Sequence, residues 1–580
     1  MKARTIGIDW ALGGVIGAEA LGVAAFAALP TYRFGWWPAA AVTVTAAILL
    51  LVTVHRRNVA VWLAARARWM RARRYTTAVG AAVDISHSGR IYGVRTAGNE
   101  AVTIVEVDGR AYSPTFLRAS TVSRTDNVLP LGVLTALMEQ PGGLHLGIDI
   151  VSAGYRVRPG TGYPQLYATL LADRGAAGQR STHLIVRLDI NESLPGLVYR
   201  HSIGSAAAAA TERIVNALQQ DGIRARALNA EEHDAVLAEL SVGLASPPPR
   251  PAHADERDSG EQETDSDDDA PAELVTAGAR AGGGDTSRAA LSAAPSRIRA
   301  KADVGWATIN ANPGYVTSYY FSPEDITTTT FNQMWSLRSD YVVHVMMLRK
   351  PAHGPVMVSA LVRTTDPRAP QQPPTLFLNP LPGEQYAAAL AAAPTTRPHL
   401  LLPSRALSAL ELDIPIGPTG ILVGAAAHDD KSASPSIQRD DLVMWALTDP
   451  QQATRIVMDT SEFYVRQLLI RAAAAGERIA IYSRDPSRWY SVSQPNIAVV
   501  EAGHPAEFVP TIIVNDRPQL VPSAGLSSTV ITVGASPTDS GEPDIRFEQT
   551  SQSGVRITTA SRSLDLEMVV FRQEQTWTGG

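Results

Sequence analysis

The chain contains no cysteine, which excludes disulfide bonds, thiolate zinc sites and a cysteine nucleophile. Lysine is nearly absent and occurs only as Lys2, Lys301, Lys350 and Lys431. None of these lysines follows a glycine, so the Gly-Lys step of a P-loop nucleotide site is missing. No G-x-S-x-G nucleophile elbow and no H-E-x-x-H zinc motif occur. The sequence therefore lacks the common signatures of nucleotide, metal and acyl-transfer chemistry.

The formal net charge is also small, at -5 over 580 residues. No segment joins a basic face to interleaved aromatic residues, so a nucleic-acid-binding domain is not indicated. The length allows about two to four domains, each with its own core. The charges are unevenly placed, with arginines near the N-terminus and acidic residues in the middle of the chain.

Two long apolar runs lie near the N-terminus, at about residues 10–29 and 36–54. A helix of twenty residues, at a rise of 1.5 Å per residue, spans about 30 Å, the thickness of a bilayer core. A short turn joins the two runs, and Trp36 and Trp37 fall where interfacial aromatic residues belong. The sequence therefore predicts a hairpin of two transmembrane helices in the plasma (inner) membrane.

Arginines gather directly after the second run, whereas the turn between the runs carries only Arg33. The positive-inside rule then predicts that both termini lie in the cytoplasm. A cleaved signal peptide ending near 25–27 is the alternative, although the second apolar run argues against it. The residues that we expect at the membrane interface are Trp36, Trp37, Arg56, Arg57, Arg66 and Arg68.

The first apolar run carries one charge, Glu19, at its centre. A carboxylate at that depth costs roughly 2.5–3.5 kcal/mol on insertion scales, so Glu19 should face protein rather than lipid. Gly14, Ala18 and Gly22 form a row of small residues that allows close helix packing. These four residues predict either packing within the hairpin or contact with a helix of another subunit.

Residues 58–74 continue as an arginine-rich helical pattern, with Trp62 and Trp69 seven positions apart on one face. Such a segment suits a helix lying along the cytoplasmic headgroups. A simple stop-transfer collar is the other interpretation. Together with the two runs, this helix completes an N-terminal unit over 1–75.

Beyond residue 75, strand-like and helix-like patterns alternate, which favours an α/β sandwich with a partly parallel sheet. We expect one α/β subdomain over 76–245 and a second over 301–495, followed by a β-rich segment over 496–580. Both subdomains show hairpin, helix, strand and helix in that order, which raises the suspicion of an internal repeat. No sequence identity between them supports it.

Residues 246–300 interrupt this pattern, with ten acidic residues between Asp255 and Glu273 against one arginine. So little apolar surface cannot offset the entropy cost of ordering, which predicts a disordered linker or insertion. A second interpretation is an acidic arm that docks on a basic partner or on the arginines of this chain.

Four runs of residues carry a resemblance to a known family. They are Asp149–Val157 (DIVSAGYRV), Leu184–Leu188 (LIVRL), Pro415–Gly424 (PIGPTGILVG) and Arg471–Gly476 (RAAAAG). Together with the N-terminal hairpin, their order and spacing resemble EccE, a membrane component of the actinobacterial type VII (ESX) secretion system. The acidic insertion and the β-rich C-terminal extension depart from that family's pattern.

The resemblance implies a two-helix anchor, a cytosolic body and a place in a membrane complex with EccB, EccC and EccD. It further implies a position at the periphery of that complex beside EccD. The cytosolic domain of the family is described as similar to glycosyltransferases, without a known activity. We therefore expect a non-enzymatic structural subunit of the secretion complex, with no cofactor and no small-molecule substrate.

Two polar clusters bear on that expectation. Asp265 and Asp267 have the Asp-x-Asp spacing of a metal-binding nucleotide-sugar site, but they lie in the acidic stretch. His428-Asp429-Asp430-Lys431 follows a predicted strand, where sites of α/β proteins lie, yet an exposed polar turn explains it better. The sequence thus predicts no catalytic, cofactor-binding or metal-binding residue. A membrane-anchored glycosyltransferase-like enzyme acting on a lipid-linked acceptor stays the alternative, and a regulatory ligand-binding domain is a third possibility.

Overall fold

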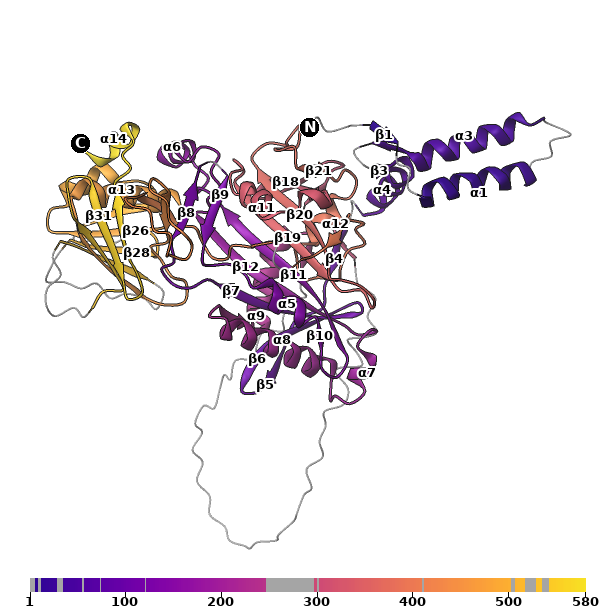
Figure 1. Ribbon diagram of the computed structural model, residues 1–580, viewed down its shortest axis with the longest axis horizontal. Coiled ribbons are helices and arrows are strands. Elements are labelled where there is room, and N and C mark those ends of the chain that lie inside the picture. Colours follow the sequence, from indigo (N-terminus) through magenta and orange to yellow (C-terminus); the bar gives the residue numbers. More distant parts are fainter. Residues whose placement is uncertain are drawn as a thin grey trace, which may run out of the picture.

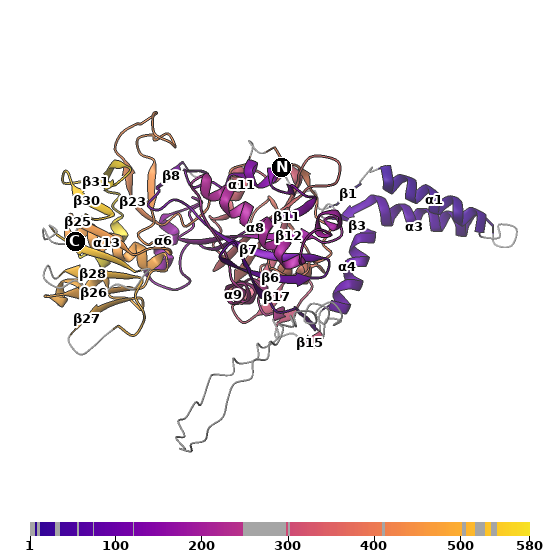
Figure 2. The ribbon, with the colours of Figure 1, turned by 90° about the horizontal axis from the view of Figure 1, so that it is seen from below.

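The protein is elongated, with a helical hairpin at one end, a large central sheet in the middle and a second large sheet at the other end (Figures 1 and 2). The structure is a computed structural model. It describes residues 6–8, 12–28, 35–54, 57–72, 75–119, 121–246, 297–299, 302–408, 412–501, 506–516, 528–534 and 542–579. Large sheets combined with helices confirm the predicted mixed α/β class. The predicted disordered insertion lies almost wholly outside the described residues.

The hairpin consists of α1 (Leu12–Ala28) and α3 (Trp37–Leu51), which run side by side in both views. These helices have 17 and 15 residues, fewer than the predicted runs. Among the described residues, none of the helices combines the length and the apolar character needed to cross a membrane. Within the described residues, the helix of the second predicted span, 36–54, is thus shorter than expected. One reason is that β2 (Val52–Val54), rich in β-branched residues, forms a strand instead of another helical turn.

A small sheet and a third helix connect the hairpin to the body. β2 pairs with β1 (Ile6–Ile8) and β3 (Arg57–Asn58), and α4 (Val59–Ala72) follows. The predicted arginine-rich helix over 58–74 is therefore confirmed for the described residues. α4 lies at an angle to the hairpin and beside the central sheet (Figure 2).

The central sheet is antiparallel in every pairing of its described strands, which corrects the prediction of a partly parallel sheet in this region. A parallel pair needs a long crossover connection, usually a helix. Antiparallel neighbours such as β6 and β7, or β19 and β20, can instead be joined by short hairpins. Its main path runs through β16 (Asp303–Val304), β17 (Ile309–Ala311), β18 (Gly314–Phe321), β20 (Met357–Asp366), β19 (Tyr341–Arg349), β11 (Leu144–Tyr155), β12 (Gln179–Asp189), β7 (Glu100–Asp108), β6 (Arg90–Ala97) and β5 (Val83–His87).

Helices cover both faces of this sheet, so its central strands are buried on both sides. In β11, Ile148 and Ile150 pack on one side, whereas Val151 and Ala153 pack on the other. This alternation follows from the two-residue period of a strand. The first face is covered by α5 (Leu131–Ala136), α8 (Ile203–Gln220) and α11 (Thr328–Met334), and the second by α9 (Ala230–Ser241) and α12 (Gln385–Leu390).

The topology of the central sheet supports the suspected repeat. The chain passes from β7 through α5 to β11 and then back to β12, which lies between them. In the second half it passes from β18 through α11 to β19 and back to β20 in the same way. The two halves meet where β11 pairs with β19, for example at Val151 and Val345. The predicted division into 76–245 and 301–495 stays a prediction, but this pairing joins both segments in one sheet.

The second large sheet forms the other lobe and contains the parallel strands. From β27 to β30 neighbouring strands are parallel, and from β30 to β9 they are antiparallel. Its order is β27 (Ile497–Val500), β26 (Ile479–Ser483), β28 (Ile512–Asp516), β29 (Thr529–Val533), β25 (Thr454–Asp459), β30 (Ile545–Gln549), β31 (Gly554–Thr559), β32 (Ser563–Glu567), β23 (Ile421–Ala426), β24 (Leu442–Trp445), β8 (Thr115–Arg118) and β9 (Val122–Thr125). We call this part the C-terminal lobe, although β8 and β9 come from early in the chain. Its helices include α6 (Tyr163–Leu170), α13 (Glu462–Ala474) and α14 (Gln575–Thr578).

Candidate functional site

The row of small residues packs α1 against α3 within this chain. Ala18 and Gly22 are buried, and a Cβ atom added to Gly22 would lie 2.9 Å from the methyl group of Thr43. A Cβ atom added to Gly14 would lie 3.5 Å from the carbonyl oxygen of Leu50. The row of small residues therefore serves helix packing within the hairpin of this chain. Glu19, in contrast, is exposed and remains available to another molecule.

The outer surface of the hairpin is strongly apolar. Leu12 and Val23 on α1 are 77% and 70% exposed, and Ile48 on α3 is 50% exposed. Trp36 and Trp37 stand at the distal end of α3 and are also exposed. A contiguous apolar surface of this kind marks contact with a membrane or with another protein.

Of the predicted arginine collar, only part falls in the described structure. Arg56 lies outside the described residues, and the side chains of Arg57 and Arg68 are not described. Arg66 is described, and its guanidinium carbon lies 4.4 Å from the ring centre of Trp69 and 5.1 Å from that of Trp306. Arg66 thus binds aromatic rings of its own chain through cation–π contacts.

The aromatic face of α4 meets the body at what we call the tryptophan clamp, formed by Trp62, Arg66, Trp69 and Trp306. The rings of Trp69 and Trp306 meet edge to face with centres 5.6 Å apart, and Trp62 lies 6.1 Å from Trp306. The indole nitrogen of Trp69 donates a hydrogen bond of 3.0 Å to the carbonyl oxygen of Val304. Both predicted tryptophans of α4 therefore pack on protein.

Trp306 is itself held in place by a contact with Gly383. Gly383 has a φ of +78°, and its N–H donates a 2.6 Å hydrogen bond to the carbonyl oxygen of Trp306. A Cβ atom at Gly383 would lie 2.4 Å from the Trp306 ring, so only glycine allows this approach. The clamp consequently ties the hairpin and α4 to the central sheet through a rigid contact.

Three of the four runs that carry the family resemblance, 149–157, 415–424 and 471–476, contribute to the junction between the two large sheets. The hydroxyl of Tyr155 lies 2.0 Å from the position that a Cβ atom of Gly476 would take. Arg180 donates a 2.6 Å hydrogen bond from Nε to the carbonyl oxygen of Gly417, and Arg158 N–H donates to Ala474 O at 2.7 Å. These runs thus act in joining the two lobes.

Buried charges form a network on the central sheet. The carboxylate of Asp149 pairs with Nε of Arg187 at 2.6 Å and with a guanidinium nitrogen of Arg349 at 2.7 Å. Arg187 also pairs with Glu100 at 3.0 Å, and Arg397 pairs with Glu100 at 3.1 Å. Burial alone would raise the pKa of Asp149, but the arginines Arg349, Arg187 and Arg397 lower it to about 2.

A second buried ion pair fastens the end of the chain to α13. Arg471 donates from Nε and Nη2 to the two carboxylate oxygens of Glu574 at 2.9 and 2.8 Å, and both side chains are fully buried. Tyr163 on α6 donates its hydroxyl proton to the same carboxylate at 2.5 Å. One carboxylate near the C-terminus therefore connects three segments of the C-terminal lobe.

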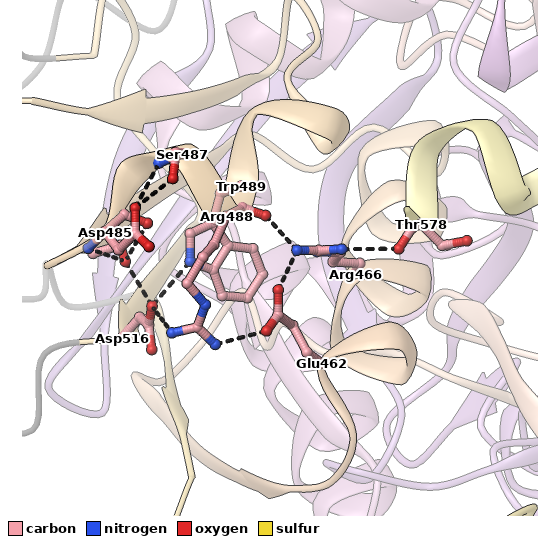
Figure 3. A network of polar contacts seen from close by, with 9 residues as sticks. Glu462, Arg466, Asp485, Ser487, Arg488, Trp489, Asp516 and Thr578 are labelled. Atoms are coloured by element: carbon pink, nitrogen blue, oxygen red, sulfur yellow. Dashed lines mark hydrogen bonds and ion pairs between the residues drawn. The ribbon is translucent and has the colours of Figure 1, made fainter. Parts of the chain in front are cut away.

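The carboxyl ends of the parallel strands are the place where α/β proteins usually bind ligands. Here Asp516, at the end of β28, accepts hydrogen bonds from Ser483 at 2.6 Å and from the indole of Trp489 at 3.0 Å (Figure 3). Glu462 at the start of α13 accepts from Arg488 at 2.7 Å and also pairs with Arg466 (Figure 3). These carboxylates are occupied by neighbouring side chains. Within the described ranges, no group of His, Asp and Glu is arranged to hold a metal ion.

The two polar clusters singled out in the sequence do not form such a site in the described structure. Asp430 accepts hydrogen bonds from the hydroxyl and the N–H of Ser432, which lower the pKa of its carboxyl group, and it is exposed. The preceding strand β23 is antiparallel to both neighbours, so the loop does not follow a parallel strand. Asp265 and Asp267 lie outside the described residues.

Sequence patterns gave no sign of two of the residues that hold the molecule together. Trp306 lies in a short irregular segment, and Glu574 lies in a 3₁₀ turn without periodic neighbours. A bulky aromatic residue and a carboxylate in otherwise irregular chain are the only signals that could have suggested them.

Comparison with known proteins finds similar sequences in one family. Residues 176–264 match the family described as "Putative type VII ESX secretion system translocon, EccE". The chain is 26% identical over 507 residues to the ESX-2 secretion system protein EccE2 of Mycobacterium tuberculosis (strain CDC 1551 / Oshkosh), covering 84% of this chain and 82% of the relative. It is 27% identical over 418 residues to the ESX-5 secretion system protein EccE5 of Mycobacterium tuberculosis (strain ATCC 25618 / H37Rv), covering 67% and 87%.

These matches define the chain as a component of a type VII ESX secretion system. More narrowly, the chain is similar to the EccE family over the matched residues, which confirms the resemblance predicted from the four runs. The names of the relatives indicate no enzymatic activity.

Proposed function

We propose that this chain is a non-enzymatic structural subunit of the ESX membrane complex that braces the cytosolic side of the machine. The observation that carries the proposal is the tryptophan clamp, which fixes the apolar hairpin to the body through Trp69 and Trp306. A subunit that holds a cytosolic assembly at a fixed position relative to the membrane needs such a rigid connection. The buried ion pairs of Asp149 and Glu574 support the same role, since they stiffen both lobes.

The proposal includes the placement of the hairpin. Its exposed apolar surface would enter the plasma membrane, with Trp36 and Trp37 at an interface and both termini on the cytoplasmic side. Arg56, Arg57 and Arg68 would meet the inner headgroups, whereas Arg66 would do so from within the clamp. Glu19, exposed on α1, would contact a helix of a neighbouring subunit.

We further propose EccB, EccC and EccD as partners, with this chain at the periphery of the complex beside EccD. The likeness of the body to a degenerate glycosyltransferase fold belongs to the same proposal. The parallel strands of the C-terminal lobe are the feature that supports it.

The first test is purification of the tagged full chain in mild detergent, followed by mass spectrometry and native sizing. We expect a large particle that contains an ESX ATPase subunit and multi-span membrane subunits. Recovery as a lone monomer or a small homo-oligomer would contradict the structural role. Hydrolysis or transfer of a nucleotide-sugar by the purified chain would instead favour the glycosyltransferase-like alternative.

Trp306→Ala is expected to release α4 from the body, because it removes the ring that contacts Trp62, Arg66 and Trp69. Each such aromatic or cation–π contact contributes about 0.5–1.5 kcal/mol. The chain has no cysteine, so spin labels can be placed at the exposed positions Leu63→Cys and Ala307→Cys without background labelling. We expect the distance distribution between the labels to broaden, together with lower recovery of the complex.

The matched control for the clamp is Trp37→Ala, which removes an exposed tryptophan of the hairpin. It should leave the distance distribution between the same two labels unchanged. An unchanged distribution in Trp306→Ala would show that the clamp does not hold α4.

A further inference from the structure

A cavity of about 680 Å³ lies at one end of the central sheet, beneath the C-terminal end of α9. This volume falls within the range of about 300–1,000 Å³ that is common for small-molecule sites. Strand ends of both halves of the sheet contribute to its walls, including β11, β19 and β20. The residues that matter for its chemistry are Tyr155, Glu239, Asp340, Tyr341, Arg363 and Thr365.

Asp340 is the charge in this cavity that lacks a counter-ion. Its N–H donates a 2.9 Å hydrogen bond to the carbonyl oxygen of Thr365, which fixes the backbone. Among the described residues, its carboxylate has no hydrogen bond or ion pair. Burial and the nearby Asp366 raise the pKa of Asp340. An incoming cation would relieve both the burial cost and the repulsion between the two carboxylates.

The other two charges of the cavity, Glu239 and Arg363, interact electrostatically, and Glu239 also accepts a hydrogen bond from Tyr341. Arg363 is buried and donates from Nη1 to the carbonyl oxygens of Leu240 and Ala389, at 2.5 and 3.2 Å. Its Nε atom has no acceptor among the described residues but is inaccessible to solvent, so it offers little to a ligand. Burial lowers the pKa of Arg363 to about 10, while Tyr341 and Glu239 act in the opposite direction. The charged side chains that line the cavity therefore sum to a net negative charge, which Asp340 carries.

Two tyrosines line the cavity, together with aliphatic residues that include Val242 and Pro313. The hydroxyl of Tyr341 donates a 2.5 Å hydrogen bond to Glu239, and the hydroxyl of Tyr155 lies against Gly476. With the hydroxyls directed to these neighbours, the rings contribute carbon surface to the walls. Aromatic faces next to a carboxylate are a common arrangement for binding ammonium and guanidinium groups.

We infer that this cavity is a binding site for an organic monocation, an ammonium or guanidinium group on an apolar body, with Asp340 as its counter-ion. A free small molecule and a basic side chain of a protein segment present this same chemistry, so both are sources of the ligand that the test must separate. The inference goes beyond the proposed structural role, so either can fail without the other.

The test is calorimetric titration of the detergent-solubilised full chain with benzamidine, a planar cation on an apolar ring. We expect saturable binding at one site, and no binding of benzamide, its neutral counterpart. Asp340→Asn keeps the side-chain volume and should weaken benzamidine binding about tenfold or more. The matched control Asp221→Asn removes an exposed carboxylate at the end of α8 and should leave the affinity unchanged.

A second titration distinguishes the two sources of the cation. Acetyl-Gly-Arg-Gly-amide carries a single guanidinium on a peptide, and butylguanidine carries a single guanidinium on a small molecule. Tighter binding of the peptide supports a protein segment as ligand, and tighter binding of butylguanidine supports a small molecule. Equal affinity for benzamidine and benzamide, or unchanged affinity in a correctly folded Asp340→Asn variant, would overturn the inference.

Discussion

Glu574→Ala is expected to lower the free energy of unfolding of the C-terminal lobe by about 3–5 kcal/mol. The substitution leaves the fully buried guanidinium of Arg471 without its carboxylate, and it also removes the acceptor of the Tyr163 hydroxyl. Two carbonyl oxygens, of Leu422 and Val569, still accept hydrogen bonds from Arg471 but carry no full charge. A buried cation without a counter-ion is far more costly than the loss of the pair's own attraction.

Urea unfolding, followed by tryptophan fluorescence and by limited proteolysis of the C-terminal lobe, measures this effect. The matched control is Glu567→Ala, since Glu567 on β32 is about half exposed and lies 3.8 Å from the exposed Arg439. Its loss should change stability by less than about 0.5–1 kcal/mol. Replacing both partners by methionine should recover much of the stability lost in Glu574→Ala. A stability of Glu574→Ala equal to that of the control would contradict the role of the pair.

Asp149→Asn is expected to destabilise the central sheet by about 3–5 kcal/mol above about pH 5, because Arg349 and Arg187 lose a shared buried partner. The same carboxylate predicts a pH dependence. Its folded pKa of about 2 lies below the value of about 3.9 expected for an unfolded chain. Its contribution is therefore fully present above about pH 5 and is lost as the pH falls through about 4 towards 2.

The size of that pH-dependent part is about 2–3 kcal/mol, from a shift of about two pKa units. It is measured as the difference in unfolding free energy between the wild type and Asp149→Asn at several pH values. We expect the difference to shrink between about pH 4 and pH 2. Asp413→Asn, which alters an exposed aspartate, should show no such trend. A difference that stays constant across this pH range would exclude Asp149 as its origin.

Local features of the fold were predictable because neighbours in sequence determine them. Gly98 and Asn99 separate two strand-like runs, which predicts a hairpin, and Gly98, with a φ of +63°, supplies the turn between β6 and β7. Asn229 and Glu232 have the spacing of a capping box, and the box forms at the start of α9 with both hydrogen bonds at 2.9 Å. In each case the side chains and the backbone that they serve lie within about four residues.

Local patterns misplaced two helix starts. Asp459 and Glu462 have the spacing of a capping box, but α13 begins at Glu462 with Ser461 as its N-cap, so Glu462 is the first and not the third helical residue. Ser322 and Pro323 are a typical helix start, yet they open only a 3₁₀ turn, Pro323–Asp325, and α11 begins after Thr327, whose hydroxyl accepts from Thr330. More than one residue near each start could serve as a cap, and the local sequence does not select between them.

The candidate site depended even more on distance in sequence. The resemblance identified the runs that meet at the junction, but not that Tyr155 would lie on Gly476. The clamp joins Trp69 to Trp306, and no periodicity links two residues so far apart. Strand partners are likewise determined by the tertiary context, so the pairing of β11 with β19 could not be predicted from the sequence of either strand.

The position of β8 determines when its sheet can be completed during synthesis of the chain on the ribosome. Leu117 on β8 pairs with Leu442 on β24, so an early strand completes its sheet only after most of the chain has been synthesised. Phe116 and Leu117 are buried in the finished lobe, and until that moment both belong to an unpaired apolar edge. Long-range pairing of this kind slows folding and favours association with wrong partners. A nascent chain of this design is therefore a natural client for chaperones, and its separated halves should aggregate when produced alone.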